Sequence, residues 1–308
     1  MSGIVHRIDF PDIAESVKYS PSPIQVISFT NSEIFIKRDD LVHPRINGNK
    51  ARKFESLLHI GQNEIENLIS WGGAQSNAMY ALSWIAKYNN WKFHYYCKTL
   101  PEWVRNNPAG NLCTALENNM ILHEIPHAEF SRVGDFINNN TPPGKNRIIP
   151  IGGQTPMAES GIQTLARELQ SDILKLGLNN IDIFISSGTG TSALYLSKNL
   201  AEYTVYTMPV VGNRDYLLQQ MISLYQIPEN LVILTPDIHI PFAKPYPEFY
   251  EIYRELLAAG IEFDLIYDIP LLLWIKNHIK DFKNRNILFI HSGGVHGNAS
   301  QLLRYHVT

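Results

Sequence analysis

Two lysines lie three residues apart in a segment that could carry amine chemistry. Lys50 and Lys53 stand in the run GNKARKFE at 48–55, where a helix is expected to begin, so both amines face one side of that helix. A lysine whose pKa is depressed is nucleophilic and can form a Schiff base with a carbonyl compound. Charge clusters such as this one, with KRDDL at 37–41 just before it, are more often solvated surfaces. The segment alone leaves both interpretations open.

A turn rich in glycine and threonine follows the apolar run 181–186. Its residues 187–192 (SGTGTS) lead into a stretch with helical periodicity. Backbone N–H groups at a helix start form an anion site, for which phosphate is the natural ligand. The turn lacks the Gly-Lys-Ser/Thr of a P-loop and the third glycine of a dinucleotide-binding loop; a purely structural turn is the alternative. A lysine held in a phosphate-binding protein suggests pyridoxal 5′-phosphate (PLP), bound through a Schiff base.

The segment 68–77 forms a second turn between an apolar run and a helical stretch. It ends in Gln75, Ser76 and Asn77, whose amide and hydroxyl groups are expected in the first helical turn. The positive end of the helix there favours an anionic substrate group such as a carboxylate. Helix capping is the alternative role of these side chains. A third turn, HSGG at 291–294, ends the last apolar run.

The run HEIPH at 123–127 satisfies the HExxH pattern of zinc enzymes by its letters. That pattern holds zinc because an unbroken helix places both histidines on one face. Pro126 interrupts such a helix, and the residues before it have the pattern of a strand. We therefore expect no metal site here or elsewhere in the chain.

Composition excludes several classes of protein. The chain has 308 residues, 44% of them hydrophobic, and 26 Lys+Arg against 29 Asp+Glu give a formal net charge of −3. The length suits one large or two medium domains. A near-neutral charge argues against nucleic acid or an anionic membrane as partner, and no apolar run approaches the roughly 18 residues of a membrane span. The first residues lack the apolar core of a signal peptide, so we expect a cytoplasmic enzyme.

Short β-branched runs alternate with amphipathic stretches along the whole chain. Strands are expected at 33–37, 67–70, 91–97, 120–125, 147–151, 181–186, 203–211, 231–234 and 287–291. Helices are expected at 75–88, 157–176, 191–201, 215–225, 249–259 and 271–282. This alternation predicts an α/β fold with parallel sheets flanked by helices. The polar segment 136–146 is expected to be an exposed connection, either a domain boundary or a loop within one domain.

Five motifs in this order resemble the fold-type-II PLP enzymes. They are KRDDL, GNKxRKxE, GGxQSN, the phosphate turn and HSGG. More narrowly, the chain resembles the branch with 1-aminocyclopropane-1-carboxylate (ACC) deaminase and D-cysteine desulfhydrase, from about residue 23 to residue 294. The resemblance implies a two-domain, tryptophan synthase β-like architecture. It implies a large cofactor-binding domain from 1–53 and 154–308, and a small domain, 54–153, that carries the Gln-Ser-Asn helix start.

The resemblance also implies roles for individual residues. Lys50 is then the Schiff-base lysine, with Ser76 and Tyr267 as further catalytic residues. Cofactor contacts fall on Lys53, Asn77, the phosphate-turn residues Gly188, Thr189, Gly190 and Thr191, and Asp268 facing the pyridine nitrogen. Substrate contacts fall on Gln75, Ser76 and Asn77.

The implied activity is that of a PLP-dependent deaminase or lyase acting on a small amino acid. An acidic residue at Asp268 is closer to the glutamate of ACC deaminase, which releases ammonia and a 2-oxo acid, than to the threonine of D-cysteine desulfhydrase. The desulfhydrase, which eliminates sulfide and yields pyruvate and ammonia, is the alternative, as is another fold-type-II enzyme or a non-catalytic binding module. Ala78 and Tyr80 replace a larger polar residue and an arginine of the family, which bears on the substrate. Family members are commonly homodimers.

Overall fold

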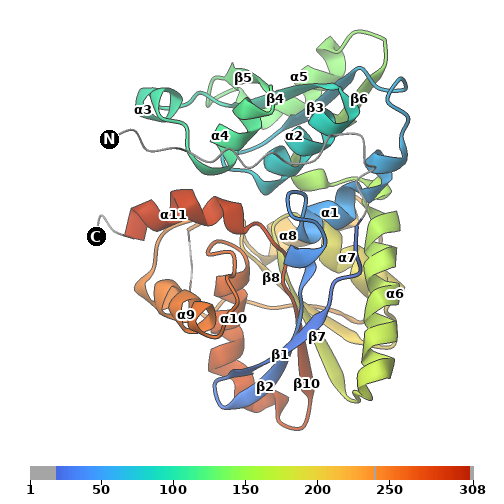
Figure 1. Cartoon of the computed structure of the whole chain (residues 1–308), viewed down its shortest axis with the longest axis vertical. Helices are drawn as coiled ribbons and strands as arrows, with labels where there is room; N and C mark the ends of the chain where they lie inside the picture. The colour runs from blue at the N-terminus through green and yellow to red at the C-terminus, as the bar shows by residue number, and fades with distance from the viewer. Residues whose placement is uncertain (1–18, 239–240, 306–308) are drawn as a thin grey trace, which may run out of the picture.

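The computed structural model describes residues 19–238 and 241–305, which form two sheets flanked by helices (Figure 1). The predicted lack of a signal peptide concerns residues that lie outside these ranges. Among the described helices, none has both the length and the apolar character that crossing a membrane requires.

The larger sheet has six strands and is parallel except at one edge. Its order is β1 (Ile24–Phe29), β2 (Ser32–Lys37), β10 (Asn286–Ile290), β7 (Ile181–Ser187), β8 (Thr204–Pro209) and β9 (Leu231–Ile233). Only β1 and β2 pair antiparallel, and every other neighbouring pair in this sheet is parallel. The strands β2, β10 and β7 therefore end side by side at the same edge.

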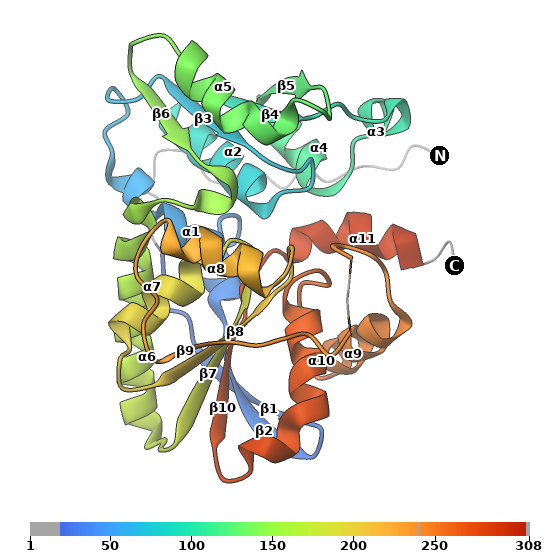
Figure 2. The ribbon, with the colours of Figure 1, turned by 180° about the vertical axis from the view of Figure 1, so that it is seen from behind.

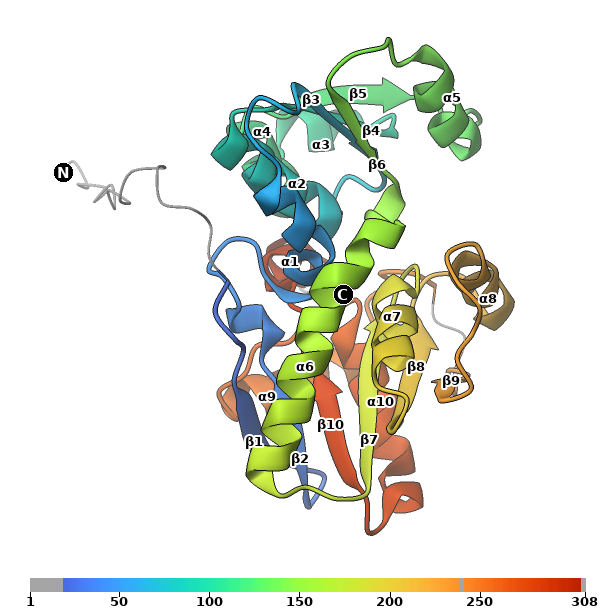
Figure 3. The same cartoon turned by 90° about the vertical axis from the view of Figure 1, so that its right-hand side faces the viewer.

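Helices cover both faces of the larger sheet (Figure 3). One face packs against α6 (Glu159–Leu176), α7 (Thr191–Asn199) and α8 (Arg214–Ile222). The other packs against α9 (Pro247–Ala258) and α10 (Asp268–His278). Strand β7 is buried along its whole length, as expected for a central strand of a sheet covered on both faces.

The smaller sheet has four parallel strands in the order β5 (Ile121–Ile125), β4 (Lys92–Lys98), β3 (Asn67–Trp71) and β6 (Asn146–Ile149). Helices α2 (Asn77–Asn89) and α4 (Gly110–Glu117) pack on one face and α5 (Val133–Asn140) on the other, while α3 (Glu102–Asn106) follows β4 (Figure 2). All these strands fall within residues 54–153. Helix α1 (Gly48–Phe54) lies between the two sheets, and α11 (Asn298–Tyr305) ends the described chain.

Short 3-10 helices link several of these elements. They span Asp39–Leu41, Glu55–His59, Phe130–Arg132, Ile151–Gly153, Pro156–Ala158, Ile279–Phe282 and Val295–Gly297.

The expected strands and helices are present, with ends shifted by a few residues, and the predicted α/β class is confirmed. The expectation for 136–146 is partly wrong. Its first residues belong to α5, in which Val133 and Ile137 are buried against Ile69 of the smaller sheet, and only the residues after Asn140 form a connection. Helix α5 packs on the smaller sheet and β6 is one of its strands. The connection between them therefore lies within the part of the chain that forms the smaller sheet and its helices.

A buried ion network fixes α1 to the larger sheet. The guanidinium of Arg52, 1% exposed, donates to Asp39 at 2.8 and 3.1 Å and to Glu168 of α6 at 2.7 and 2.8 Å. Lys37, at the end of β2, pairs with the same Glu168 at 3.1 Å and with Asp172 at 2.7 Å. Since Arg52 stands between the two lysines of interest, this network sets the position of the helix that presents them.

Candidate active site

Lys50 lines a small pocket between the two sheets. The pocket is lined by residues of α1, α2 and the chain after β10: Asn47, Lys50, Asn77, Tyr80, Ala81, Ser292, Gly294 and His296. Burial lowers the pKa of Lys50 to about 8, although the negative charge of Asp264 opposes this effect. A substantial part of the amine is therefore neutral, and so nucleophilic, near neutral pH.

The start of α1 is docked on the HSGG turn, which explains the glycine before Lys50. Gly48 has φ +62°, and a Cβ added to it would lie 1.8 Å from the carbonyl oxygen of Ser292. The N–H of Asn49 donates to that same oxygen at 3.0 Å. Only glycine permits this approach, so the Gly-Asn pair places Lys50 directly beside Ser292.

The predicted phosphate turn has the properties of an anion site. Gly190 occupies the cap position of α7 with φ +73° and offers no side chain, so the first N–H groups of the helix lack a side-chain cap. Within the described chain, the buried hydroxyl of Ser192 has no hydrogen-bond partner. Thr189 and Thr191 hydrogen-bond each other through their hydroxyls at 3.0 Å. The free N–H groups and the orphaned hydroxyl fit a phosphate at this helix start.

Lys53 lies next to this turn. Its Nζ donates to the carbonyl oxygen of Gly152 at 3.0 Å, and a Cβ on Gly152 would lie 2.9 Å from Thr189. Burial and the positive charge of Lys50 hold the pKa of Lys53 well below that of a free lysine. A phosphate bound at the turn would stabilise the charged amine, so Lys53 also fits the predicted group.

The Gln-Ser-Asn segment supports the start of α2. The hydroxyl of Ser76 accepts from the N–H groups of Ala78 and Met79 at 3.2 and 3.3 Å, which is the capping role. Gln75 donates to Ala109 at 2.9 Å and accepts from the N–H of Asn111 at 3.0 Å, so its amide is bound to the start of α4.

Asn77 belongs to the pocket itself. Its Oδ1 accepts from the amide of Asn111 at 2.8 Å, and its amide also hydrogen-bonds to Asp264. The structure therefore brings Asn77 to Lys50, whereas the side chain of Gln75 points to α4.

Tyr267 lies against the phosphate turn at the start of α10. A Cβ on Gly188 would lie 3.2 Å from its ring. Burial and the negative charge of Asp264 raise the pKa of Tyr267, so the phenol keeps its proton. Asp264 accepts from the N–H groups of Ile266 and Tyr267 at 2.8 and 2.6 Å, and burial together with the charge of Asp268 raises its pKa to about 7.

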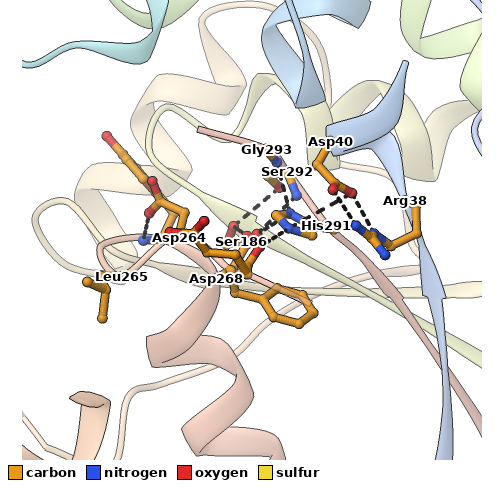
Figure 4. A network of polar contacts seen from close by, with 12 residues as sticks. Arg38, Asp40, Ser186, Asp264, Leu265, Asp268, His291, Ser292 and Gly293 are labelled. Carbon is orange, nitrogen blue, oxygen red and sulfur yellow. Dashed lines mark hydrogen bonds and ion pairs between the residues drawn. The ribbon is translucent and has the colours of Figure 1, made fainter. Parts of the chain in front are cut away.

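Asp268 is fully buried and lies behind Ser292, to which it is hydrogen-bonded (Figure 4). Its Oδ1 accepts from the hydroxyl of Ser186 at 2.8 Å, and its Oδ2 accepts from the N–H of Ser292 at 3.1 Å. Among the described residues that line the pocket, Ser292 is present and Asp268 is not. The carboxylate therefore acts on the pocket through Ser292.

Several residues of this site have no assigned role in the sequence analysis. They are Asp264, Ser192, Ser292 and His291, and all belong to motifs visible in the sequence: the segment before Asp268, the phosphate turn and HSGG. Because these residues lie within those motifs, the motifs could have been used to identify them.

The first three residues of HEIPH lie on a strand, as predicted for the residues before Pro126, and Pro126 and His127 follow its end. His123 and Glu124 belong to β5, where Glu124 pairs with Arg105 and His123 lies 3.0 Å from Nδ1 of His94. Over residues 19–238 and 241–305, no group of three or more histidine, cysteine or acidic side chains is placed to hold a metal ion.

Comparison with known proteins identifies relatives over nearly the whole chain. No family model matches the chain. It is 26% identical to a putative 1-aminocyclopropane-1-carboxylate deaminase of Thermotoga maritima, with 92% of this chain and 97% of the relative covered. It is also 26% identical to the mitochondrial bifunctional D-cysteine desulfhydrase/1-aminocyclopropane-1-carboxylate deaminase of Arabidopsis thaliana, with 95% and 80% covered.

Among solved structures, an ACC deaminase homologue superposes with a TM-score of 0.71 at 18% identity, covering 97% of this chain and 99% of the other. This likeness confirms the fold expected from the five motifs. The chain is similar in sequence to proteins named as ACC deaminase and D-cysteine desulfhydrase, and it shares the fold of the fold-type-II enzymes.

Proposed function

We propose that this protein is a PLP-dependent deaminase or lyase of a small amino acid, with an activity like that of ACC deaminase. The observation that carries the proposal is the pocket in which Lys50, with a pKa of about 8, lies beside Asn77 and Ser292. The names of the relatives support the same class of reaction.

The residues that would hold PLP come from four parts of the chain. Lys50 would bind it covalently, Lys53 and residues 188–191 would bind its phosphate together with Ser192, Asn77 would flank it, and Asp268 would act on its ring through Ser292. When bound, PLP supplies the electron sink for the reaction.

The charge states of the site residues define what each can do. Once released by a substrate amine, Lys50 is a base whose Nζ can take a proton, because its pKa lies near neutral pH. Tyr267 keeps its phenolic proton, because burial and Asp264 raise its pKa, so its hydroxyl can hydrogen-bond a neighbouring group but is not a base. The hydroxyl of Ser76 accepts from two N–H groups and also hydrogen-bonds the side chain of Tyr95.

The substrate carboxylate would meet the start of α2. The side-chain amide of Gln75 both donates to and accepts from the start of α4. These two hydrogen bonds hold the backbone of the turn in place for an anion. We therefore assign Gln75 an indirect part in substrate binding, because it holds the turn in place. Ser76 and Asn77 would lie nearer the substrate.

Two candidate substrates follow from the residues around Asp268. Its acidic side chain favours ACC, which has no α-proton and needs an acid or nucleophile at its ring, for which Tyr267 and Ser76 are available. The arrangement of Ser292 favours D-cysteine, because a hydroxyl-bearing residue lines the pocket while the carboxylate lies behind it. Elimination from D-cysteine requires only removal of the α-proton and loss of thiolate.

A substrate panel separates these candidates. The protein with PLP is mixed with ACC, both enantiomers of cysteine and D-serine, and release of 2-oxo acid, ammonia and sulfide is measured. We expect turnover of ACC. Sulfide from D-cysteine without turnover of ACC would replace ACC deamination by desulfhydration, and no product from any of the four would contradict the proposed class of substrate.

Loss of the Lys53 charge should weaken binding of the phosphate. For Lys53→Gln we expect the Kd for PLP to rise by about ten- to 100-fold, since a hydrogen bond to a charged group contributes about 1.5–3 kcal/mol. Binding of pyridoxal, which has no phosphate, should be unchanged. Lys198→Gln, at the far end of α7, is the control and should bind PLP normally. Equal affinities of Lys53→Gln and the unaltered protein for PLP would remove Lys53 from the phosphate site.

We further propose the domain division 1–53 with 154–308 and 54–153, a homodimer, and a cytoplasmic location without nucleic-acid or membrane partners. The small domain is supported by the smaller sheet, whose strands lie between Asn67 and Ile149. The near-neutral charge supports the absence of nucleic-acid and membrane partners. The homodimer is supported by the resemblance, since members of that family are commonly homodimers.

A further inference from the structure

A buried histidine and a buried carboxylate form a close pair beneath the pocket (Figure 4). His291 and Asp268 are both fully buried, and Nδ1 of the histidine lies 3.0 Å from Oδ2 of the carboxylate. The imidazole stacks on Phe263 with ring centroids 4.4 Å apart, so its plane is fixed. His291 has no role predicted from the sequence and takes no part in the proposed reaction.

Hydrogen-bond partners define the protons of this pair. Nε2 of His291 lies 2.8 Å from the carbonyl oxygen of Glu262, and a carbonyl only accepts, so Nε2 carries a proton. The hydroxyl of Ser186 and the N–H of Ser292 both donate to Asp268 and stabilise its ionised form. The separation of 3.0 Å between Nδ1 and Oδ2 of Asp268 is that of an ion pair in which the ring carries a second proton. The N–H of Gly293, 3.1 Å from Nδ1, is the contact that opposes this state.

A second carboxylate extends the network towards the surface. Asp40 lies 3.9 Å from Nε2 of His291, and Arg38 holds it through two hydrogen bonds of 2.8 and 2.7 Å. Arg38 and Asp40 follow β2, His291 follows β10 and Ser186 lies in β7. The ends of three neighbouring strands therefore contribute side chains to one continuous network of polar contacts.

We propose that His291 is a positioning residue, which as an imidazolium holds Asp268 ionised and fixed beneath Ser292, with Asp40 supporting its charge. The inference rests on the proposed function in one respect, because the resemblance makes Asp268 the acidic partner of the pyridine nitrogen. Removal of His291 would leave a buried carboxylate without its cationic partner, which is strongly unfavourable. Asp268 would then no longer be held in place beneath Ser292.

The charges around the pair agree with this assignment. Burial lowers the pKa of His291, but the hydrogen bond and charge of Asp268, the charge of Asp40 and the carbonyl of Glu262 outweigh it and raise the pKa above the ordinary value. Asp264 is the other charged group that interacts with Asp268. His291 should therefore remain protonated at a pH where an exposed histidine is neutral.

The test uses the full-length protein with ¹⁵N-labelled histidine, with and without PLP, from about pH 5 to about pH 8. The ring signals of His291 are assigned by their loss in His291→Gln, and His59→Gln, at an exposed histidine, is the matched control. At about pH 7 we expect both ring nitrogens of His291 to be protonated, whereas an ordinary histidine with pKa about 6.5 is mostly neutral. A neutral His291 at that pH would overturn the proposal.

Two variants test the partners. Asp268→Asn should lower the pKa of His291 strongly, and Asp40→Asn should lower it less, because its carboxylate is farther away and already paired with Arg38. A His291 pKa that is the same in Asp268→Asn as in the unaltered protein would overturn the proposal. These measurements do not require PLP. They can therefore contradict the role of His291 while the proposed function stands, and the proposed function can fail while the role of His291 stands.

In the protein with PLP, His291→Gln should lower kcat by about tenfold or more, the effect of a one-unit change in the acidity of a catalytic group, and leave KM nearly unchanged. Asp40→Asn keeps the buried pair and so serves if His291→Gln does not fold. In that variant His291 loses its proton at a lower pH, so the fall in kcat on the alkaline side should move to lower pH. Parallel changes in kcat and KM in His291→Gln, or an unmoved profile in Asp40→Asn, would reduce His291 to a packing role.

Discussion

Replacing Lys50 by alanine should abolish both the colour of the protein with PLP and its activity. Lys50 is the amine that lies in the pocket with Asn77 and Ser292, and its pKa of about 8 makes it the nucleophile of the site. Loss of a covalent catalytic group typically costs about a thousandfold or more in kcat. The measurements are the visible absorption of the protein after addition of PLP and the rate of 2-oxo acid release.

Borohydride reduction followed by peptide mapping would locate the attachment point. We expect the label on the peptide that contains Lys50, and no label in Lys50→Ala. Lys276→Ala removes an exposed lysine paired with Glu255 and should keep both colour and label. A persistent visible band in Lys50→Ala would move the attachment to another amine, first of all Lys53, which lies three residues away.

Replacing Arg52 by methionine should strongly destabilise the fold. Asp39 is fully buried and Glu168 is largely buried, and in this variant both lose the guanidinium that pairs them. Removing one partner of a buried ion pair typically costs about 3–5 kcal/mol, because a buried charge is left uncompensated. The free energy of unfolding in urea is the quantity to measure.

Arg105→Met is the matched control for this change. Arg105 also pairs with a carboxylate, Glu124, at 2.8 Å, but its side chain is 49% exposed. Exposed pairs contribute about 0–1 kcal/mol, so this variant should unfold at nearly the same urea concentration as the unaltered protein. Equal losses in the two variants would mean that burial of the Arg52 network adds nothing to stability.

Sequence patterns could predict the elements that carry the site. β7 is a continuous apolar run followed by a small-residue turn, and α2 and α6 have clear helical periodicity. β1 is harder to predict because it is an edge strand with Val26 exposed, so its apolar residues do not alternate cleanly. Helix α5 is harder to predict because it has only 8 residues and ends in three asparagines, which are weak helix formers.

The residues of the site could be predicted where a local motif carries them. Lys50, Ser76 and the phosphate turn are marked by glycine and by the change from strand to helix. The pairing of His291 with Asp268 depends on β2, β10 and β7 lying side by side, and no local pattern shows which strands are neighbours. No local pattern shows that the side chain of Gln75 hydrogen-bonds to the start of α4 either, because that contact depends on the packing of α2 against α4.

The position of β10 has a consequence for how the protein reaches its active form during synthesis. Strand β10 lies between β2 and β7 in the sheet, yet its residues Asn286–Ile290 leave the ribosome after those of every other strand in residues 19–238 and 241–305. The smaller sheet, whose strands follow one another in sequence, can assemble first, while the larger sheet stays in two parts until β10 inserts. Ser292, which closes over Gly48, arrives at the same moment. The pocket around Lys50, which Ser292 and Gly294 help to line, is therefore complete only once β10 has joined the sheet.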